Sequence, residues 1–391
     1  MSVGRWLWGA LVMVLAVVAA VVTTAKVQPR DLADEGLTVP AQGPAVTAPV
    51  CTPVSLEERA GRVLLVGLPG VTTPSNPLVD EVLDVGVGGV MLTHANVTDA
   101  PQVRELTGAI RARARTPMLV AADEEPGRVR AFGDILGSLP SARRLAAQTS
   151  LVDVKEIARQ NAASMKALGI NLALAPVADL DAGPWNGVIG DRSFSGDPAE
   201  ASQYVLAYAH GLRQGGVTPV VKHFPGHGQA RGDDHLGQAE VNLPLTTLTQ
   251  KEALPFADAI RAGVPVVMMG NVAYDALEPD VPAGLSAAAY KLLRDMGFTG
   301  VAITDSIGMG AVNLRWDFDE AAIKAVAAGA DGVLATDGRQ ARRMQEALVA
   351  AVRDGRLDER RLSEAAARMA ALAGADPMLI SCQSATMPVL R

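Results

Sequence analysis

Eight short apolar runs, separated by longer stretches of mixed polarity, constrain the fold of this 391-residue chain more than any other feature. The runs are apolar throughout rather than alternating, which is typical of strands in a parallel sheet that is covered on both faces. The predicted strands are Val63–Val66, Gly89–Leu92, Met118–Ala121, Asn171–Ala175, Pro219–Lys222, Val264–Met268, Val301–Thr304 and Gly332–Leu334.

The stretches between these runs are rich in Ala, Leu, Arg and Glu, and glycine or proline marks most of the junctions. We expect helices there, for example over Val103–Ala114, Leu151–Leu168, Pro198–Gln214, Lys251–Ala262, Ala287–Met296 and Glu320–Ala328. Eight such units over about 320 residues predict an α/β protein, a single (β/α)8 barrel of the TIM type. A doubly wound α/β sheet is the alternative.

The first 27 residues predict a signal peptide or an N-terminal transmembrane anchor. Trp6–Ala25 carries no charge and is flanked by Arg5 and Lys26. A helix of that length, about 30 Å, just crosses the hydrocarbon core, and the length favours an anchor over a cleaved signal. A buried core helix is a further alternative. An anchor or a signal implies an extracytoplasmic protein, secreted or held at the membrane through this segment only.

The remaining chain divides into a proline-rich linker (28–54), the barrel (55–374) and a C-terminal tail (375–391). The two cysteines, Cys51 and Cys382, flank the predicted barrel. In an oxidising compartment a disulfide between them would tie its two ends together. The alternative is two unrelated free thiols.

Charge and aromatic content bear on the partners. The chain has 35 basic and 42 acidic residues, a net charge of -7 and no block of like charge, so we expect no nucleic-acid partner. Aromatic residues make up only 4%, which disfavours a long aromatic-lined polysaccharide cleft. Three of the five histidines lie between residues 223 and 235, and this clustering indicates a site.

Polar residues follow five of the predicted strands. In a (β/α)8 barrel the carboxyl ends of the strands form one face, where the active site lies. We therefore expect these side chains to converge at one mouth: Asp123, Asp179, Lys222–His223, Asn271 and Asp305.

Two segments carry groups suited to catalysis. Lys222–Gly228 and Asp233–His235 form a glycine-rich loop, in which Asp233 can accept the Nδ1 hydrogen of His235 and leave Nε2 free for proton transfer. Asp305 ends a buried strand. Facing the cationic Lys222, its carboxylate can stay ionised and act as a nucleophile. An N-cap for the following helix is an equal interpretation of Asp305.

A third segment, Asp123–Arg128, and Arg192 within Gly190–Phe194 offer acceptors and donors of the kind that sugar hydroxyls require. Ion pairs at the rim of the barrel are the alternative interpretation, and such pairs contribute little stability.

Together, these segments and Gly169–Asp179 resemble glycoside hydrolase family 3, and within it the bacterial β-N-acetylhexosaminidases of the NagZ type. The resemblance runs in order through most of residues 55–372. It implies a retaining β-N-acetylglucosaminidase with Asp305 as nucleophile, His235 as general acid and base, and Asp233 orienting His235. It implies substrate-binding roles for Asp123, Arg128, Arg192, Lys222 and His223. It implies no metal and no cofactor.

The expected partner is a small GlcNAc-containing carbohydrate, such as a cell-wall muropeptide or an oligosaccharide, bound by a monomer. Four positions depart from the family pattern. Pro126 replaces a usual glycine, Asp234 a Ser or Thr, and Ser306 a common second Asp; Gly270–Asn271–Val272 replaces Ala-His-Val. None is the expected nucleophile or acid, so we expect activity with an altered substrate preference.

Several alternatives stay open. A GlcNAc phosphorylase or a β-glucosidase could use the same scaffold, and a histidine repels phosphate less than a carboxylate does. A metal-dependent hydrolase would use His223, His227, His235 and Asp305, although no early strand carries an HxH pair. An inactive, membrane-tethered sugar-binding protein is the non-enzymatic alternative.

Overall fold

A computed structural model of the protein describes residues 51–181 and 183–391. The predicted signal or anchor segment and nearly all of the predicted linker lie outside these residues. Within the described part of the chain, no helix is both long enough and apolar enough to span a bilayer.

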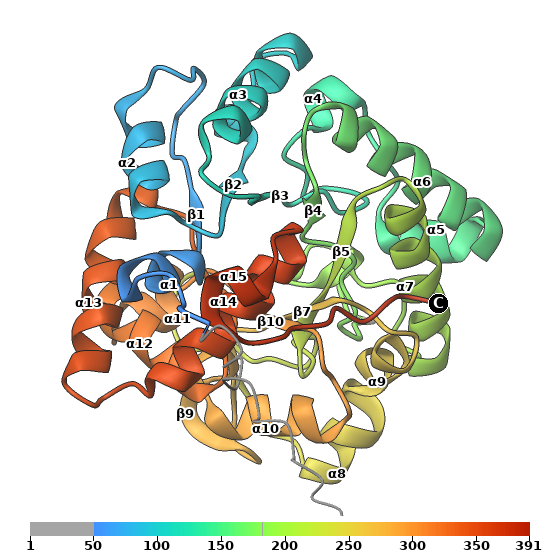
Figure 1. The fold of residues 1–391 in the computed structure, drawn as a ribbon. Coiled ribbons are helices and arrows are strands. Elements are labelled where there is room, and N and C mark those ends of the chain that lie inside the picture. The colour runs from blue at the N-terminus through green and yellow to red at the C-terminus, as the bar shows by residue number, and fades with distance from the viewer. Residues whose placement is uncertain (1–50, 182) are drawn as a thin grey trace, which may run out of the picture. The chain divides into compact units, whose positions relative to one another are not determined.

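Eight parallel strands form a barrel (Figure 1). Their order is β10-β7-β5-β4-β3-β2-β1-β11, and a bridge between Ile303 and Gly332 joins the two outer strands, so the sheet closes on itself. This closure confirms the predicted barrel and excludes the doubly wound sheet. The strands are β1 (Leu64–Gly67), β2 (Gly89–Leu92), β3 (Leu119–Ala122), β4 (Leu172–Ala173), β5 (Thr218–Phe224), β7 (Val266–Met269), β10 (Val301–Thr304) and β11 (Val333–Ala335).

Helices follow the strands and cover the outside of the barrel. Several of these helices begin with an N-cap side chain that accepts a backbone hydrogen bond. Ser150 caps α6 by accepting from Asp153 N, and Asp197 caps α7 by accepting from Glu200 N. The main helices are α2 (Pro77–Val85), α3 (Ala100–Arg113), α6 (Leu151–Ala167), α7 (Pro198–Gln214), α9 (Leu254–Arg261), α10 (Ala287–Asp295), α12 (Phe318–Ala328) and α13 (Ala341–Arg353).

These helices confirm the predicted ones, with one difference. The helix expected over Lys251–Ala262 is divided into a π-helical segment, Leu248–Glu252, and α9. Shorter or later helices are α1 (Leu56–Arg62), α4 (Gly133–Leu136), α5 (Ala142–Gln148), α8 (Leu245–Thr247), α11 (Gly310–Asn313), α14 (Glu359–Ala373) and α15 (Pro377–Ser381).

A second, three-stranded sheet was not predicted. It consists of β6 (Glu240–Val241), β8 (Ala273–Tyr274) and β9 (Glu278–Pro282), in the order β6-β8-β9. Two of its strands have only two residues, too few for a recognisable hydrophobic pattern. The sheet joins the segment that follows β5 to the segment that follows β7, and so ties together two connections that leave the same face of the barrel.

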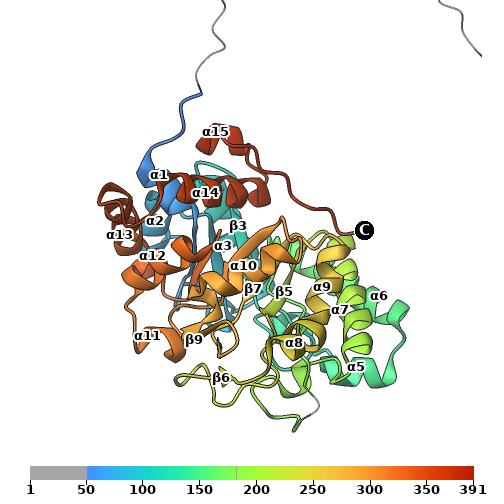
Figure 2. The ribbon, with the colours of Figure 1, turned by 90° about the horizontal axis from the view of Figure 1, so that it is seen from below.

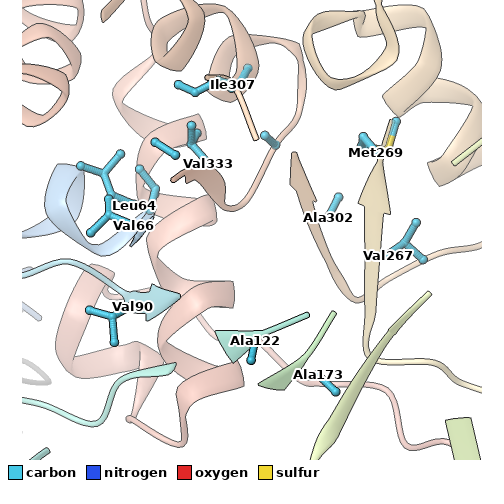
Figure 3. Close-up of a cluster of buried hydrophobic side chains, with 14 of the residues drawn as sticks. Leu64, Val66, Val90, Ala122, Ala173, Val267, Met269, Ala302, Ile307 and Val333 are labelled. Carbon is cyan, nitrogen blue, oxygen red and sulfur yellow. The ribbon is translucent and has the colours of Figure 1, made fainter. Parts of the chain in front are cut away.

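The barrel strands are buried on both faces. Leu65, Leu119 and Val220 belong to a cluster inside the barrel. Their neighbours, such as Leu64 and Val66, belong to the cluster between strands and helices (Figure 3). Because successive strand side chains point to opposite faces, burial on both sides requires an uninterrupted apolar run. Each large side chain fully buried in this way contributes about 1.5–3 kcal/mol.

The C-terminal residues close the end of the barrel opposite the carboxyl ends of the strands. Met369 of α14 belongs to the interior cluster, and Met387 packs against it. The last residues then run across to α9, where Arg391 N donates to Ala262 O at 2.8 Å (Figures 1 and 2). Residues 383–391, expected as part of a tail, therefore pack against the barrel.

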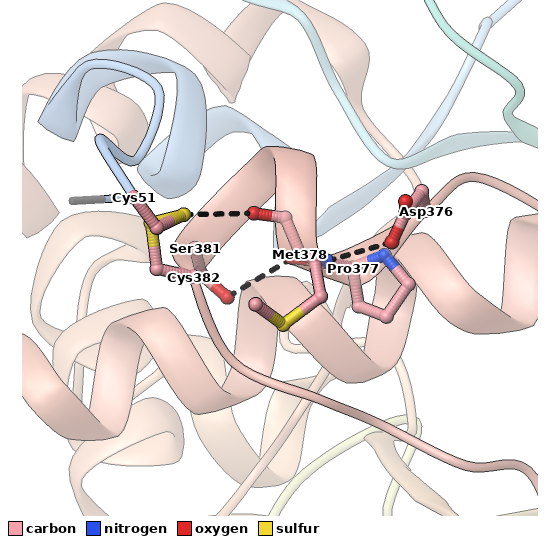
Figure 4. Close-up of a disulfide and its surroundings, with 6 residues drawn as sticks. All are labelled: Cys51, Asp376, Pro377, Met378, Ser381 and Cys382. Carbon is pink, nitrogen blue, oxygen red and sulfur yellow. Dashed lines mark hydrogen bonds between the residues drawn. A yellow bond between two sulfur atoms is a disulfide. The ribbon is translucent and has the colours of Figure 1, made fainter. Parts of the chain in front are cut away.

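A disulfide joins Cys51 to Cys382, with the Cα atoms 5.7 Å apart (Figure 4). Beside it, Val54 N donates to Ile380 O at 3.1 Å, so the first described residues pair with the helix that precedes Cys382. The start of the described chain is thus joined to the segment around Cys382 covalently and by a backbone hydrogen bond.

Candidate active site

A cavity of about 620 Å³ opens where the barrel strands end. This volume lies in the range of pockets that hold small molecules. Every residue predicted to act on or bind substrate lines it: Asp123, Arg128, Arg192, Lys222, His223, Asp233, His235 and Asp305. Of the other polar residues expected at the mouth, Asp179 and Asn271 are 1% exposed and lie behind the cavity wall.

Asp305 follows directly after β10. Its backbone N donates to Met269 O at 2.8 Å, and its Oδ1 accepts from Ser306 N at 2.7 Å. The side chain keeps 16% of its surface exposed toward the cavity. The next helix, α11, begins only at Gly310, so the alternative interpretation of Asp305 as an N-cap is wrong.

His223 lies beside Asp305 and is fixed from behind by Asp179. Its Nδ1 is 2.7 Å from Asp179 Oδ2, and the other oxygen of Asp179 accepts from His227 N at 2.7 Å. Burial alone would raise the pKa of Asp179, but His223 and His227 lower it. Asp179 therefore stays ionised and holds the His223 ring with Nε2 toward Asp305.

A buried cluster of charges forms another part of the wall. Glu125, 1% exposed, accepts from Nε and Nη2 of Arg192, each at 2.8 Å, and Lys222 Nζ lies 2.7 Å from both Asp123 and Glu125. Burial opposes the charge on Glu125, but Arg192 and Lys222 lower its pKa below the usual range. The side chains of Lys222 and Arg192 are only 3% and 9% exposed, so these are not weak rim pairs.

Sequence reasoning missed Glu125. The run Asp123–Glu124–Glu125 holds three acids, and adjacent residues diverge to different sides. Glu124 is buried away from the cavity, where Arg130 Nε donates to it at 2.6 Å. The combination of acids with Arg128 pointed to this segment as a sugar-binding one. Nothing in the sequence indicated which of the three acids holds Arg192 and Lys222 together.

Arg128 lines the cavity and also supports a loop. Its Nε donates to Asp191 at 3.2 Å, and one Nη donates to Gly187 O at 2.8 Å. Part of its donor capacity is thus used on the 187–191 segment. Asn186, Gly187 and Val188 of this loop line the cavity as well, and they carry no motif that could have revealed them.

His235 lies on the loop after β5 and is 59% exposed. Its Nδ1 is 2.9 Å from Asp233 Oδ1 and 3.3 Å from Asp234 Oδ1. The carboxylates of Asp234 and Asp233 raise the pKa of His235 to about 9, against the opposing effect of partial burial. At neutral pH the imidazole is therefore protonated and can donate a proton.

Two of the departures from the family pattern affect the segment after β10. Asn271 does not line the large cavity; its Nδ2 donates to Ser306 O at 2.8 Å and so supports this segment from behind. Ser306 lines the cavity, with its Oγ 3.3 Å from Thr336 Oγ1.

A metal site built from His223, His227, His235 and Asp305 would need their ligand atoms to converge. In the described part of the chain, the residues that bring ligand atoms within 4.8 Å of one another are instead Asp233, Asp234 and His235. The four residues of the metal-dependent alternative do not form such a group.

Comparison with known proteins gives the family. The model of the glycosyl hydrolase family 3 N-terminal domain matches residues 55–372. Beta-hexosaminidase LpqI of Mycobacterium tuberculosis is 33% identical over 360 residues, which cover 85% of this chain and 90% of that protein. A beta-hexosaminidase of Xylella fastidiosa is 40% identical over 258 residues, covering 64% of this chain and 76% of the relative.

A solved structure agrees. The glycoside hydrolase family 3 β-N-acetylglucosaminidase from Paenibacillus sp. str. FPU-7 superimposes with a TM-score of 0.79 at 30% identity, covering 85% of this chain and 64% of that one. With the family model matched over most of its length, this chain belongs to glycoside hydrolase family 3 and is a glycoside hydrolase.

Proposed function

We propose that this enzyme is a retaining, exo-acting β-N-acetylglucosaminidase that removes terminal β-linked GlcNAc by double displacement. One observation carries the proposal: Asp305 and the His235–Asp233 pair line the same cavity. Relatives named beta-hexosaminidase, and the β-N-acetylglucosaminidase structure from Paenibacillus, support GlcNAc as the sugar.

In the first step Asp305 attacks the anomeric carbon. The bond from that carbon to the leaving oxygen breaks, and the protonated His235 transfers its proton to this oxygen. In the second step water attacks the glycosyl-enzyme. His235 accepts a proton from the water, the bond to Asp305 breaks, and GlcNAc leaves with its original β configuration.

The surrounding charges support this division of roles. Arg192 and Lys222 present donors, and Asp123, with 31% of its side chain exposed, presents acceptors. We assign to them, with Arg128 and His223, the binding of the sugar hydroxyls. Asp233 orients His235, because its carboxylate holds Nδ1 and leaves Nε2 for the proton transfer.

We further propose a GlcNAc-containing muropeptide or a short oligosaccharide as the natural substrate. The apolar run Trp6–Ala25 supports an extracytoplasmic site of action, where cell-wall fragments occur. A bounded cavity of about 620 Å³ favours small substrates over long polysaccharide chains. We expect the enzyme to act as a monomer.

Phosphorolysis is a second candidate, favoured by one observation. A histidine whose pKa is raised to about 9 is a cation at neutral pH, and it attracts phosphate rather than repelling it. Comparing rates and products with and without phosphate decides between the two reactions: GlcNAc-1-phosphate appears only in phosphorolysis.

The test is a release assay on a chromogenic β-N-acetylglucosaminide and the matching β-glucoside, with wild type, Asp305→Ala and His235→Ala. We expect wild type to prefer the N-acetylglucosaminide and both variants to lose most activity. Preference for the β-glucoside, or full activity of Asp305→Ala, contradicts the proposal. Turnover by wild type excludes an inactive sugar-binding protein, and its persistence in EDTA excludes a metal-dependent hydrolase.

A further inference from the structure

Asp234 is the one residue of the Asp233–His235 segment that is buried. Its exposed fraction is 1%, whereas the side chains of Asp233 and His235 are 39% and 59% exposed. A buried carboxylate needs partners, because an unpaired charge away from water is costly. The proposed mechanism gives Asp234 no role.

The two oxygens of Asp234 face two different imidazoles. Oδ2 lies 3.1 Å from Nε2 of His227, which is 3% exposed. Oδ1 lies 3.3 Å from Nδ1 of His235 in an ion-pair contact and accepts no hydrogen bond from the described residues. Asp234 therefore bridges the loop that carries His235 to the buried ring of His227.

His227 is itself held by the barrel. Its backbone N donates to Asp179, the carboxylate that also holds His223 beside Asp305. Carboxylates and histidines consequently alternate from the proposed nucleophile to the proposed acid, in the order Asp305, His223, Asp179, His227, Asp234 and His235.

The backbone of the same loop docks on the segment that follows Asp305. Ala311 N donates to Asp234 O at 2.9 Å, and Gly310 N donates to His235 O at 3.2 Å. A Cβ at Gly310 would lie 2.8 Å from His235 O and 2.6 Å from the carbonyl carbon of Leu236, so the docking needs a glycine there.

Asp234 and His227 each favour the charged form of the other in spite of their burial. Burial by itself would raise the pKa of Asp234, but His227 and His235 lower it. Burial by itself would lower the pKa of His227, but Asp234 raises it. Opposite charges in a site of low polarity attract strongly, provided that both remain in place.

We propose that Asp234 is a positioning residue: it bridges His227 to His235 and so holds the loop with the general acid in its docked, catalytically competent place. The inference rests on the proposed function, since it assigns a purpose to the docking of His235. A hydroxyl side chain, as in the Ser or Thr that the family pattern carries here, has one short oxygen and no charge, and it cannot serve both imidazoles in this way.

Titratable groups around the bridge are Asp233 on the same loop, His223 within β5, His227 after β5, Asp179 after β4, and Glu252, whose pKa is raised by burial. Asp233 contacts His235 and is unchanged in every variant of the test. Any difference in activity between an Asp234 variant and wild type therefore reports the loss of the contacts that Asp234 makes with His227 and His235.

The test compares wild type, Asp234→Asn and Asp234→Ser with the control Glu240→Gln, which removes an exposed acid at β6, close to the same loop in sequence. Each is assayed on an aryl N-acetylglucosaminide with a good leaving group and on a GlcNAc disaccharide with a poor one. A poor leaving group needs the proton and a good one does not.

We expect both Asp234 variants to lose at least about tenfold in kcat/KM on the disaccharide and less than about twofold in kcat/KM on the aryl substrate, because kcat/KM reports the first step and the aryl group leaves without a proton. The alkaline limb of the kcat/KM profile on the disaccharide should move to lower pH. Glu240→Gln should match wild type. Asp234 variants with the leaving-group dependence and pH profile of wild type overturn the inference.

A structural measurement on the wild-type protein keeps the inference testable if the variants fold poorly. Nitrogen-15 NMR titration of labelled histidines should place the pKa of His227 above the ordinary value of 6.5, and a pKa of His227 below 6.5 overturns the proposed bridge. The outcomes for the proposed function are separate: full activity of Asp305→Ala refutes the function, whereas an inactive Asp305→Ala with a wild-type-like Asp234→Asn refutes only this inference.

Discussion

His223 stands between two carboxylates, with its Nδ1 2.7 Å from Asp179 Oδ2 and its Nε2 3.9 Å from Asp305 Oδ2. His223 lies within β5 and Asp305 directly follows β10, whereas Asp179 lies on the segment after β4, which pairs with β5 through the hydrogen bond from Ala178 N to Lys222 O. Barrel strands and a segment paired with them thus set the orientation of one imidazole against the proposed nucleophile. The barrel, rather than a flexible loop, determines this geometry.

Asp179 does not line the cavity, so substituting it should impair catalysis indirectly, through the position of the His223 ring. In Asp179→Asn the His223 ring loses its charged acceptor, although the amide oxygen can still accept from His227 N. We expect kcat/KM to fall by about 10²-fold. Steady-state kinetics with circular dichroism as a folding control checks this. Activity near that of wild type in a folded variant would show that the orientation of His223 is not needed.

The alkaline limb of activity should report on His235. The acid form must be present for the first step, and the pKa of His235 is raised from 6.5 to about 9 by Asp234 and Asp233. Activity on substrates with poor leaving groups should therefore persist through pH 8 and fall as pH rises through about 9. The measurement is kcat/KM against pH. A limb near 6.5, the ordinary value for histidine, would contradict the prediction.

The Glu125 cluster should contribute to stability as well as to binding. Glu125→Gln leaves Arg192 and Lys222 buried without their shared anion, and breaking such a buried pair costs about 3–5 kcal/mol. Urea unfolding measures the change. Glu156→Gln is the matched control, because it breaks a pair with Arg159 whose side chains are 47% and 41% exposed. We expect little or no change there, because an exposed pair contributes little stability, and equal losses in the two variants would refute the prediction.

Reduction of the disulfide should lower stability but not activity. The bond joins residues 331 positions apart, and closing a loop of that length restricts the unfolded chain by up to about 5 kcal/mol in the simple entropic model. The disulfide lies beside the C-terminal residues, which close the end of the barrel opposite the cavity. A thermal melt with and without reductant tests this, and the only two cysteines form this bond. An unchanged Tm, or lost activity at 25 °C, would contradict it.

The barrel was predictable because burial on both faces leaves a strong signal in each strand. Runs such as Val301–Ile303 have no polar residue on either face, and Asp305, just past the end of this strand, marks the mouth. Strand ends therefore located four of the eight predicted site residues, Asp123, Lys222, His223 and Asp305, without any knowledge of the side-chain contacts. The disulfide between Cys51 and Cys382 was predictable from the positions of the two cysteines in the sequence, because they flank the predicted barrel.

What the sequence did not reveal depends on long-range contacts. Asp234 directly precedes His235 in sequence, but whether its carboxylate faces solvent or His227 depends on how the loop packs. Arg128 was expected to bind sugar, and its hydrogen bonds to Gly187 and Asp191 join segments about 60 residues apart. Neither contact joins residues at the spacing of a helix turn or of alternate strand positions, so no pattern in the sequence could indicate it.

The most direct test of the account is to identify the covalent intermediate. His235→Ala lacks the base for the second step but can still react with a substrate whose leaving group needs no proton, so the glycosyl-enzyme should accumulate. Peptide mapping by mass spectrometry after rapid quenching should find one N-acetylglucosaminyl group on Asp305, and none in His235→Ala/Asp305→Ala. An adduct on another residue, or release of the α-anomer as first product by wild type, would contradict the proposed double displacement.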